Sequence, residues 1–336
     1  QSVKTGIAAE SIERAQGTPS YYGTLEIRKE PEGLLLINEL DIEDYLTRVV
    51  PSEMPSYYEK EALKAQAVCA RTYAYRQIQA NAYSQYGAHV DDSTTYQVYN
   101  NINTDSRTDS AVDETYGQIL TYEGKPVEAF YFSTSCGATA DGSIWGGEPD
   151  AVPYLKSKLL GSNPNGYDLK NNVDFDNFIR DKSYKAYDSG YSLFRWETTT
   201  TSEILAEKVT GIGQVETIAV KSRGAGGIAK ELEITGSEGV KTINGQGQIR
   251  SLLGNRSLTI KMKNGKTMTG QETLPSAFIS IEKSGNSFHI YGGGYGHGAG
   301  MSQNGAQGMA EQGQDYDEIL GFFYDGTELT EVHSQQ

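Results

Sequence analysis

The 336 residues exceed the size at which a single hydrophobic core usually stops growing, so we expect two domains. Hydrophobic residues make up 37% and charged residues 22%, as in an ordinary soluble protein, and no apolar run approaches the ~20 residues of a membrane span. The 44 acidic and 29 basic residues give a net charge of −15, which argues against nucleic acid as a partner.

The chain begins with a polar segment, residues 1–19, and shows no signal-peptide pattern. Either the chain is cytoplasmic or a membrane anchor is absent from it. Strands are predicted next, because residues 23–29 alternate in polarity and residues 33–40 form an apolar run. A short further strand is predicted at residues 46–50.

The segment Pro-Ser-Glu-Met-Pro at residues 51–55 places Glu53 between two prolines. Each proline fixes its own φ, so a tight segment is expected here. Ser56 and Glu59 have the spacing of a capping box, which predicts a helix from about Tyr57.

This helix is the most strongly patterned element of the chain. Small apolar residues recur at helical spacing and form a narrow stripe, which predicts close packing. The stripe consists of Leu63, Ala67, Ala70, Ala74 and Ile78. Lys64 and Arg71 lie seven residues apart and therefore share a second face of the same helix.

The middle of the chain is predicted to be rich in loops and strands. Residues 81–118 are expected to form loops with one short helix, and residues 118–135 two strands around a turn at 123–126. Residues 136–175 are loop-rich. From about residue 185 to 285, Thr-, Val- and Ile-rich segments alternate with Gly/Ser turns, which predicts a β-rich module. Its strands are expected at residues 215–220, 231–234, 258–262 and 278–281.

One more strand, residues 288–291, leads into a glycine-rich loop at 292–300. Such a density of glycine fits neither a strand nor a helix, and it indicates a backbone that passes close to a ligand or to another chain segment. No βαβ unit follows, which argues against a phosphate-binding loop. Two helices are predicted after it, one from about Ser302 and one from a capping box at Asp315 and Glu318.

Glu53 is the first candidate for chemistry. A carboxyl group that donates a proton near neutral pH needs its pKa raised, typically to about 6, by apolar surroundings. The residues that could supply them are Met54, Pro55, Tyr57 and Tyr58. The alternative is a solvated loop carboxylate. The 23 tyrosines and 38 glycines suit a sugar ligand, and they also fit a β-rich protein with many turns.

Other candidates carry cations, an imidazole or a thiol. Lys64 and Arg71 could orient a carboxylate or a sugar substituent, or they could simply form a solvated face. His297, with glycine on both sides, is a candidate site residue. Two cysteines, Cys69 and Cys136, allow at most one disulfide bridge. Cys136 could act as a nucleophile with His297, help to bind zinc, or be a small buried residue.

These motifs resemble those of one family, stage II sporulation protein D and the related amidase-enhancer proteins. The matching stretches are residues 49–55 (VVPSEMP), 61–74 (EALKAQAVCARTYA), 133–135 (STS) and 294–306 (GYGHGAGMSQNGA). The resemblance covers roughly residues 25–330 in collinear order, and each motif is long and unusual.

The resemblance implies a peptidoglycan lytic transglycosylase, a glycan lyase acting in cell-wall degradation during sporulation, at engulfment of the forespore. Its substrate would be denuded glycan strands, from which the peptide stems have been removed. The family also implies an extracytoplasmic protein, membrane-anchored in its full-length form, with the anchor absent from this chain. No cofactor is required, and the implied protein partner is a sporulation cell-wall amidase of the stage II sporulation protein P type.

Residue by residue, the catalytic glutamate of the family falls on Glu53, the helix cations fall on Lys64 and Arg71, and the glycine-loop histidine falls on His297. The other expected substrate-binding residues lie in or beside the same motifs. They are Tyr73, Ser135, Tyr295, Met301 and Gln303.

Two positions depart from the family pattern. Phe132 stands where many relatives have histidine, so a histidine at this position is not essential to the function of this chain. Cys136 stands where many relatives have glycine, and in a member of the clostridial type it could bind zinc.

The implied reaction needs one carboxyl group, whereas glycoside hydrolases usually need two. Glu53 would protonate the oxygen that links N-acetylmuramic acid (MurNAc) to N-acetylglucosamine (GlcNAc). It would then accept a proton from the C6 hydroxyl of the same MurNAc, which closes on C1 to give a 1,6-anhydro end. Two alternatives are a hydrolysing muramidase, with Asp91, Asp92 or Asp141 as second carboxylate, and a non-catalytic glycan-binding enhancer of an amidase.

We expect an α+β protein. Its mixed catalytic core would comprise residues 20–175 together with 285–330, and residues 176–284 would form a β-rich inserted domain. Under this assignment Glu53 and His297 share one cleft, although 244 positions separate them.

Overall fold

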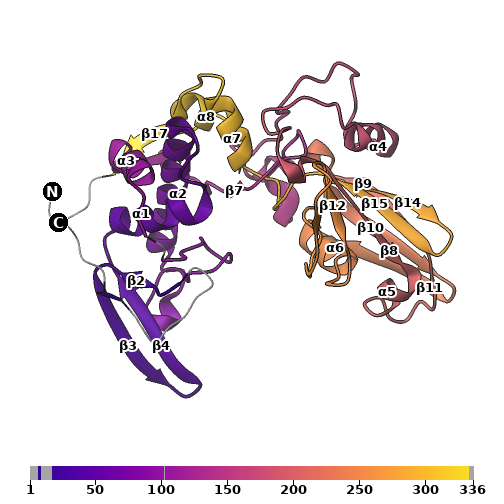
Figure 1. Cartoon of the computed structure of the whole chain (residues 1–336), viewed down its shortest axis with the longest axis horizontal. Helices are drawn as coiled ribbons and strands as arrows, with labels where there is room; N and C mark the ends of the chain where they lie inside the picture. Colours follow the sequence, from indigo (N-terminus) through magenta and orange to yellow (C-terminus); the bar gives the residue numbers. More distant parts are fainter. Residues whose placement is uncertain (1–6, 9–16, 102, 333–336) are drawn as a thin grey trace. The chain divides into compact units, whose positions relative to one another are not determined.

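The computed structural model describes residues 7–8, 17–101 and 103–332 (Figure 1). They form two compact units. The first unit contains the described parts of residues 1–130, 310–321 and 326–336, and the second contains residues 131–309 and 322–325. Among the described residues, no helix combines the length and the apolar character that crossing a bilayer requires.

Both units contain helices and strands, which confirms the predicted α+β class. The second unit contains the predicted β-rich domain, residues 176–284. It also contains two segments that were predicted to belong to the catalytic core, residues 131–175 and 285–309. The functional division into a core and an insertion stays a prediction. Most of the predicted N-terminal segment, residues 1–19, lies outside the described residues.

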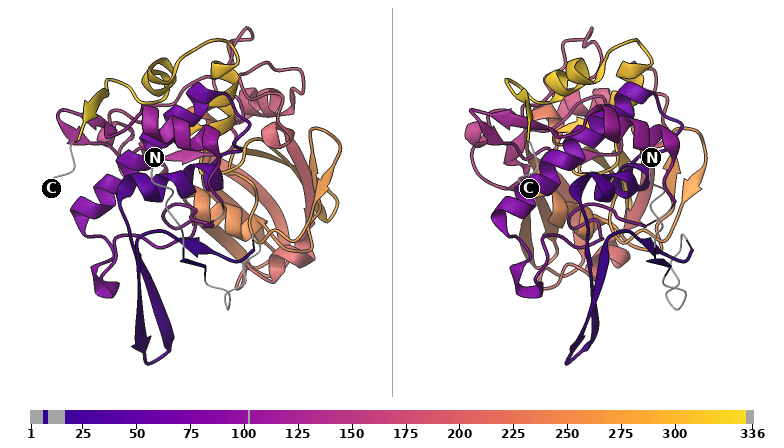
Figure 2. Two further views of the ribbon diagram at one scale, coloured as in Figure 1. Left: turned by 60° about the vertical axis from the view of Figure 1, so that its left-hand side comes forward. Right: turned by 90° about the vertical axis from the view of Figure 1, so that its left-hand side faces the viewer.

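Two of the predicted strands form a hairpin in the first unit. Strands β3 (Thr24–Glu30) and β4 (Gly33–Glu39) pair antiparallel, and the hairpin projects from the helical part of this unit in every view (Figures 1 and 2). Ile27 is 61% exposed and Leu34 is 71% exposed, so the hairpin leaves apolar side chains uncovered. A shorter pair, β1 (Ile7–Ala8) and β2 (Ser20–Tyr21), precedes it.

Helix α1 (Ile42–Glu53) replaces the strand that was predicted at residues 46–50, so that prediction was wrong. Leu46, Val49 and Val50 are buried, and their spacing of three and four residues matches a helix face. A capping residue starts the helix, since Asp41 Oδ1 accepts a hydrogen bond from Glu43 N at 2.8 Å. A short apolar run does not by itself distinguish a buried strand from one face of a helix.

Helix α2 (Lys60–Ala80) begins three residues later than predicted. The expected capping box is wrong, because Glu59 is the N-cap residue and no side chain caps this end. Tyr58 N instead donates to Pro55 O at 3.0 Å in a turn that precedes the helix. The predicted stripe is confirmed for its first four residues, which are buried, whereas Ile78 is 41% exposed. Helix α2 ends at Ala80, and the C-cap residue that follows, Asn81, has a φ of 47°.

The rest of the first unit follows the predicted order. A short helix η1 (Ser84–Tyr86) and helix α3 (Ser106–Glu114) interrupt the loops, and β5 (Gln118–Tyr122) pairs with β6 (Lys125–Pro126) across the predicted turn. On its other side, β5 pairs with β17 (Glu328–Glu331).

The second unit holds the predicted β-rich module, and its strands are confirmed. A five-stranded sheet has the order β13-β12-β8-β15-β14, and a three-stranded sheet has the order β11-β10-β9. Two short strands, β7 (Tyr131–Phe132) and β16 (Met301–Ser302), form a separate parallel pair. The sheet strands are β8 (Trp196–Thr201), β9 (Val215–Arg223), β10 (Ala229–Gly236), β11 (Gly239–Asn244), β12 (Ile260–Met262), β13 (Thr267–Met268), β14 (Ile279–Ser284) and β15 (Ser287–Gly292).

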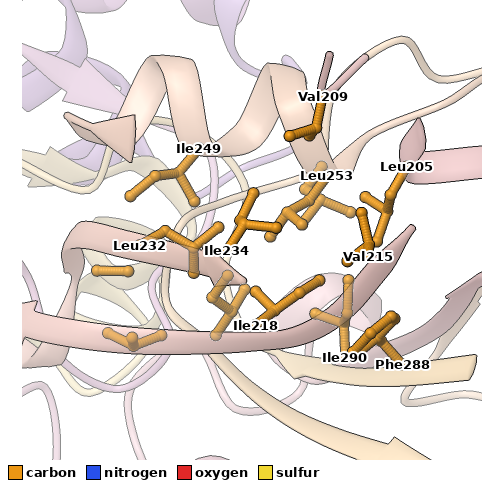
Figure 3. Close-up of a cluster of buried hydrophobic side chains, with 14 of the residues drawn as sticks. Leu205, Val209, Val215, Ile218, Leu232, Ile234, Ile249, Leu253, Phe288 and Ile290 are labelled. Atoms are coloured by element: carbon orange, nitrogen blue, oxygen red, sulfur yellow. The ribbon is translucent and has the colours of Figure 1, made fainter. Parts of the chain in front are cut away.

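Helix α6 (Gln246–Leu253) covers the main apolar core of this module (Figure 3). Ile249 and Leu253 of α6 point toward Leu232 and Ile234 of β10. Each is buried, and burying a side chain of this size contributes about 1.5–3 kcal/mol. The other helices of the unit before the glycine loop are η2 (Gly142–Trp145), η3 (Pro149–Ala151), α4 (Asn172–Arg180), η4 (Ser192–Phe194), α5 (Ser202–Ala206) and η5 (Ala225–Gly227).

Two helices follow the glycine loop, as predicted: α7 (Gln303–Ala310) and α8 (Tyr316–Phe323). The second capping box is confirmed, because Glu318 N donates to Asp315 Oδ1 at 3.3 Å and Asp315 N donates to Glu318 Oε2 at 3.2 Å.

Candidate functional site

Glu53 is the last residue of α1, and its side chain is half-buried. Its Oε1 accepts a hydrogen bond from Val98 N at 2.8 Å. At the preceding residue, Ser52 Oγ accepts a hydrogen bond from Asn100 N at 3.2 Å, so two bonds join the end of α1 to the segment 98–100. These bonds hold the carboxylate at a defined position, which proton transfer to a bound ligand requires.

The predicted apolar surroundings of Glu53 are present in part. Met54 and Tyr58 are buried, whereas Pro55 is exposed and Tyr57 is 72% exposed. Of the four residues, two are therefore buried apolar neighbours of Glu53 in the chain, and two are exposed to solvent.

A cavity of ≈910 Å³ lies in the first unit, lined by the β3–β4 hairpin, by α1 and α2, and by the segment 83–92. Its wall combines leucine and isoleucine side chains with five tyrosines, and Tyr45 stacks on Tyr99 with a centroid distance of 5.2 Å. Tyr45 also lies close to Glu53: burial raises the pKa of Tyr45, and the negative charge of Glu53 adds to this rise. Flat rings with polar tips offer stacking surfaces for sugars.

The three candidates for a second carboxylate differ in their surroundings. Asp91 and Asp92 line the cavity, and Asp91 Oδ1 accepts from both Ser93 N and Ser93 Oγ. Asp141 belongs to the second unit, where it is buried and its Oδ1 caps η2 by accepting from Ser143 N at 3.0 Å. Asp141 thus has a structural partner for its carboxylate.

Arg71 does not lie on a solvated face, so that part of the sequence interpretation was wrong. Its side chain is fully buried, and Nε and Nη2 each donate to the carboxylate of Glu43 at 2.7 Å. Its guanidinium also donates to the carbonyls of Gln118 and Val112, both at 3.2 Å. Because Glu43 belongs to α1, this ion pair joins α2 to the helix that ends at Glu53.

Lys64 has local partners as well. Its Nζ lies 3.1 Å from Glu61 and 3.8 Å from Glu114, and 4.4 Å from the ring centroid of Tyr316. Tyr73, in the same helix, is half-buried against Phe130, and burial raises its pKa to about 12. Tyr73 therefore remains a neutral phenol at physiological pH.

The glycine loop passes close to other segments of the second unit. Four glycines have a positive φ that side chains rarely adopt: Gly294 (83°), Gly296 (118°), Gly298 (87°) and Gly300 (76°). A Cβ on Gly296 would lie 2.7 Å from the Cβ of Phe132, and one on Gly298 would lie 2.4 Å from the ring of Phe278. Of the two interpretations of this loop, close approach to another chain segment is thus confirmed.

Gly298→Ala is expected to lower the free energy of unfolding by about 1–3 kcal/mol, since the added methyl group meets the Phe278 ring in a packed core. Gly270→Ala is the matched control, because Gly270 also has a positive φ (77°) but nothing lies within 4 Å of its Cβ position. Urea unfolding of both variants separates the steric cost from backbone strain. Equal losses in the two variants would contradict the role of Phe278.

His297 is half-buried and is held by two hydrogen bonds. Its Nε2 lies 2.9 Å from Tyr131 O, so this nitrogen carries the proton, and Nδ1 accepts from Ala299 N at 3.2 Å. The ring lies near Phe132 and Trp145, with centroid distances of 5.6 and 5.3 Å. Burial lowers the pKa of His297 to about 4; the bond to Tyr131 opposes this, and the charge of Arg250 adds to it.

The neutral form of His297 gives the folded state a pH dependence. Its pKa falls from about 6.5 in the unfolded chain to about 4, so its contribution to stability, up to about 3 kcal/mol, is present above pH 6.5. The contribution is lost as the pH falls from 6.5 to 4, because the unfolded chain then binds the extra proton. We expect His297→Gln to show a shallower loss of unfolding free energy over this range than wild type, measured by urea unfolding. Parallel curves would contradict the assignment.

Ser135, Met301 and Gln303, expected to bind substrate, are buried in the second unit. Ser135 donates its N–H and its hydroxyl to the buried carboxylate of Asp188, at 2.7 and 3.0 Å. Ser302 Oγ donates to the same carboxylate at 2.9 Å, so Asp188 joins the two motifs at 133–135 and 294–306. Asp188 was not identifiable from the sequence, because it lies in a loop with no motif of its own.

The surroundings of Cys136 do not fit a zinc ion. The thiol is fully buried, its Sγ lies 3.6 Å from Ala138 O, and burial raises its pKa to about 12. A zinc ligand or a nucleophile needs the thiolate, which these surroundings disfavour. Among the described residues, no group of three or more His, Cys, Asp or Glu side chains could hold a metal ion. Cys69 and Cys136 are both buried free thiols.

The expected site residues are therefore divided between the two units. Glu53, Lys64, Arg71 and Tyr73 belong to the first, with the cavity. The residues of the second are Ser135, Tyr295, His297, Met301 and Gln303. The expectation that Glu53 and His297 share one cleft stays a prediction. The partner residues Glu43 and Val98 gave no signal in the sequence, because their contacts join segments 28 and 45 positions apart.

Comparison with known proteins gives two family matches. A model of stage II sporulation proteins matches residues 30–122, which include Glu53, Lys64, Arg71 and Tyr73. A domain family of unknown function, DUF8618, matches residues 141–300.

Individual relatives align over most of the chain. Stage II sporulation protein D of Bacillus subtilis (strain 168) is 30% identical over 98% of this chain and 88% of its own length. Stage II sporulation protein D of Bacillus amyloliquefaciens is 30% identical over 89% of this chain and 76% of its own length. An amidase enhancer of Bacillus subtilis (strain 168) is 32% identical over 85% of this chain, which spans 40% of that relative's length. The chain belongs to the stage II sporulation protein D family.

Proposed function

We propose that this chain is a peptidoglycan lytic transglycosylase that cleaves the MurNAc–GlcNAc bond of stem-free glycan strands, with Glu53 as its acid/base. The position of Glu53 is the observation that supports this most. Its carboxylate is half-buried, fixed by Val98 N–H at 2.8 Å, and close to Tyr45 in the wall of a tyrosine-lined cavity. A fixed carboxyl beside aromatic surfaces suits proton transfer to a bound sugar.

In the proposed reaction, protonated Glu53 donates its proton to the glycosidic oxygen as the bond from MurNAc C1 breaks. The C6 hydroxyl of the same MurNAc then attacks C1, and Glu53 accepts the hydroxyl proton. The products are a 1,6-anhydro-MurNAc end and a GlcNAc with a free 4-hydroxyl, and no water is consumed. Glu53 regains its starting protonation state, so one carboxyl group suffices, whereas hydrolysis usually needs two.

The substrate also indicates where the protein acts and with which partner. Peptidoglycan lies outside the cytoplasmic membrane, so we propose an extracytoplasmic role in wall degradation at engulfment during sporulation. Stem-free strands form when an amidase removes the peptide stems. A sporulation amidase is therefore the proposed partner, in keeping with a relative that is named an amidase enhancer.

That same relative supports a second candidate function, a glycan-binding protein that enhances an amidase without cleaving the strand itself. In that case the tyrosine-lined cavity would bind glycan while Glu53 has no chemical role. The two functions differ in a directly measurable way, since only the transglycosylase changes the length of the strands.

The test is to incubate stem-free strands with the chain and to identify the new ends by mass spectrometry. The proposed function predicts 1,6-anhydro-MurNAc ends, lighter by one water than the products of hydrolysis. Reducing MurNAc ends would instead show a muramidase and direct attention to Asp91 and Asp92 in the cavity wall. Binding without new ends, where a control enzyme cleaves the same strands, would show the enhancer and contradict the transglycosylase.

A further inference from the structure

Arg250 has unusual surroundings for a half-buried cation. It lies in the last turn of α6, and its Nε donates to Leu274 O at 2.9 Å. Within the described part of the chain, its two terminal nitrogens make no hydrogen bond and no carboxylate pairs with it. By contrast, the buried Arg195 and Arg223 each donate three hydrogen bonds. A partly desolvated charge without a counter-ion is costly, so a ligand that supplies one would be favoured.

The segment 274–276 connects Arg250 to the glycine loop. Leu274 N donates to Arg250 O at 3.0 Å, and the next residue, Pro275, accepts a hydrogen bond from Gly296 N at 3.0 Å. Ser276 Oγ donates to Gly293 O at 2.6 Å. These bonds hold the last turn of α6 beside the glycine loop. The Arg250 charge interacts with Tyr295 and His297: burial is the main reason for the low pKa of His297, and the Arg250 charge adds to it.

Two exposed aromatic side chains accompany this cation in the second unit. Trp145 is 49% exposed, and its ring lies 5.3 Å from that of His297. Tyr295 is 38% exposed and lies in the glycine loop, and its backbone N–H and carbonyl are both hydrogen-bonded to Thr134. The bonds at Tyr295 fix the backbone, and Gly146 after Trp145 has a φ of 101°. Exposed aromatic rings at the surface provide stacking faces for the apolar side of a sugar ring.

We propose that Arg250, Trp145 and Tyr295 form a subsite for a sugar ring that carries a carboxylate, an inference that rests on the proposed glycan substrate. The rings would stack on the sugar, and the terminal nitrogens of Arg250 would bind the carboxylate in the bidentate manner typical of arginine. The protein as a whole has a net charge of −15, so an anionic ligand needs such a local cation.

In a peptidoglycan strand, this chemistry singles out the lactyl group of MurNAc. While the peptide stem is attached, the lactyl carbonyl is part of a neutral amide. Removal of the stem creates a carboxylate, and Arg250 then distinguishes the stem-free strand from the stem-bearing one by a single charge. The subsite thus gives a physical reason why a strand without stems would be preferred.

The experiment compares two tetrasaccharides of alternating GlcNAc and MurNAc, one with free lactyl carboxylates and one with the same carboxylates converted to amides. Binding is measured by calorimetry with the full chain carrying Glu53→Gln, so that no ligand is cleaved. We expect Arg250→Gln to weaken binding of the free acid by about tenfold and that of the amide by less than twofold. Arg250→Lys should recover part of the affinity, because lysine keeps the positive charge but cannot bind the carboxylate with two parallel hydrogen bonds.

Two further variants complete the test. Trp145→Ala should weaken both ligands by about fivefold, because stacking does not depend on the carboxylate. Arg256→Gln is the matched control, because it also removes an arginine. Arg256 is 74% exposed and pairs with Glu272, so the affinity for both ligands should stay unchanged.

The outcomes separate this inference from the proposed function. The wild type could cleave stem-free strands while Arg250→Gln leaves the affinity for both ligands unchanged, or lowers both affinities equally. Either result overturns the subsite and leaves the proposed function standing. If neither ligand binds and no strand is cleaved, both fail. A selective loss for the free acid, in variants whose thermal unfolding matches that of the parent, supports the subsite.

Discussion

Glu53→Gln is expected to reduce the rate of strand cleavage by about 10²–10⁴-fold while the affinity for stem-free glycan stays within about twofold. Glutamine keeps the size of the side chain, and its amide oxygen can still accept the hydrogen bond from Val98 N, so the fold and the binding surface should persist. The variant lacks the proton that protonates the glycosidic oxygen. Cleavage is measured from the yield of anhydro ends, and binding from co-sedimentation with strands.

Glu32→Gln is the matched control for this prediction. Glu32 is exposed in the turn of the β3–β4 hairpin, so the substitution removes one negative charge away from α1 and should leave cleavage unchanged. Anhydro ends formed by Glu53→Gln at the wild-type rate would remove Glu53 from the mechanism. Loss of binding together with cleavage would instead indicate that Glu53 serves to hold the ligand.

Arg71→Ala is expected to lower the free energy of unfolding by about 3–5 kcal/mol. Helical spacing predicts Arg71 on a face separate from the packed stripe, but its side chain is fully buried and pairs with Glu43 through two 2.7 Å hydrogen bonds. Alanine would leave the Glu43 carboxylate, which is 15% exposed, without its cation. Since α1 ends at Glu53, activity should also fall, as a consequence of the displaced helix. Urea unfolding followed by circular dichroism gives the free energy.

Arg76→Ala provides the comparison, because Arg76 also lies in α2 and pairs with a glutamate, Glu128, at 2.8 Å. That pair is 41% and 35% exposed, so its loss should cost less than about 1 kcal/mol. The double variant of Arg71 and Glu43 should lose less than the sum of the two single variants, since the two residues interact directly. If Arg71→Ala is as stable as Arg76→Ala and yet inactive, Arg71 acts on the substrate after all.

Local patterns were sufficient for much of the secondary structure. Strands form where the sequence predicts them, at the alternating residues 23–29 and at the apolar run 33–40. The strands of the β-rich module also form where they are predicted. The capping box at Asp315 and Glu318 forms as predicted, because all its atoms lie within one turn of helix. The failed capping box at Ser56 and the missed helix α1 occur where the pattern was short, and a turn or a distant packing surface decided the conformation.

The motif residues were also identifiable, but their surroundings were not. The sequence placed Glu53, Arg71 and His297 in distinctive motifs, and their family was recognisable from those stretches alone. Whether each faces solvent or protein was decided by partners far along the chain: Glu43 for Arg71, and Tyr131 for His297.

The sequence by itself thus determined the α+β class, the family and the position of the candidate acid, because these depend on residue types and on spacings of a few residues. Only the tertiary structure decided that Arg71 is a buried helix-to-helix link and that Asp188 joins two motifs. It also decided that Arg250 has no counter-ion among the residues that the structure describes. The physical reason is that the energy of a charge depends on which groups surround it after folding, and those groups come from segments that no local pattern connects.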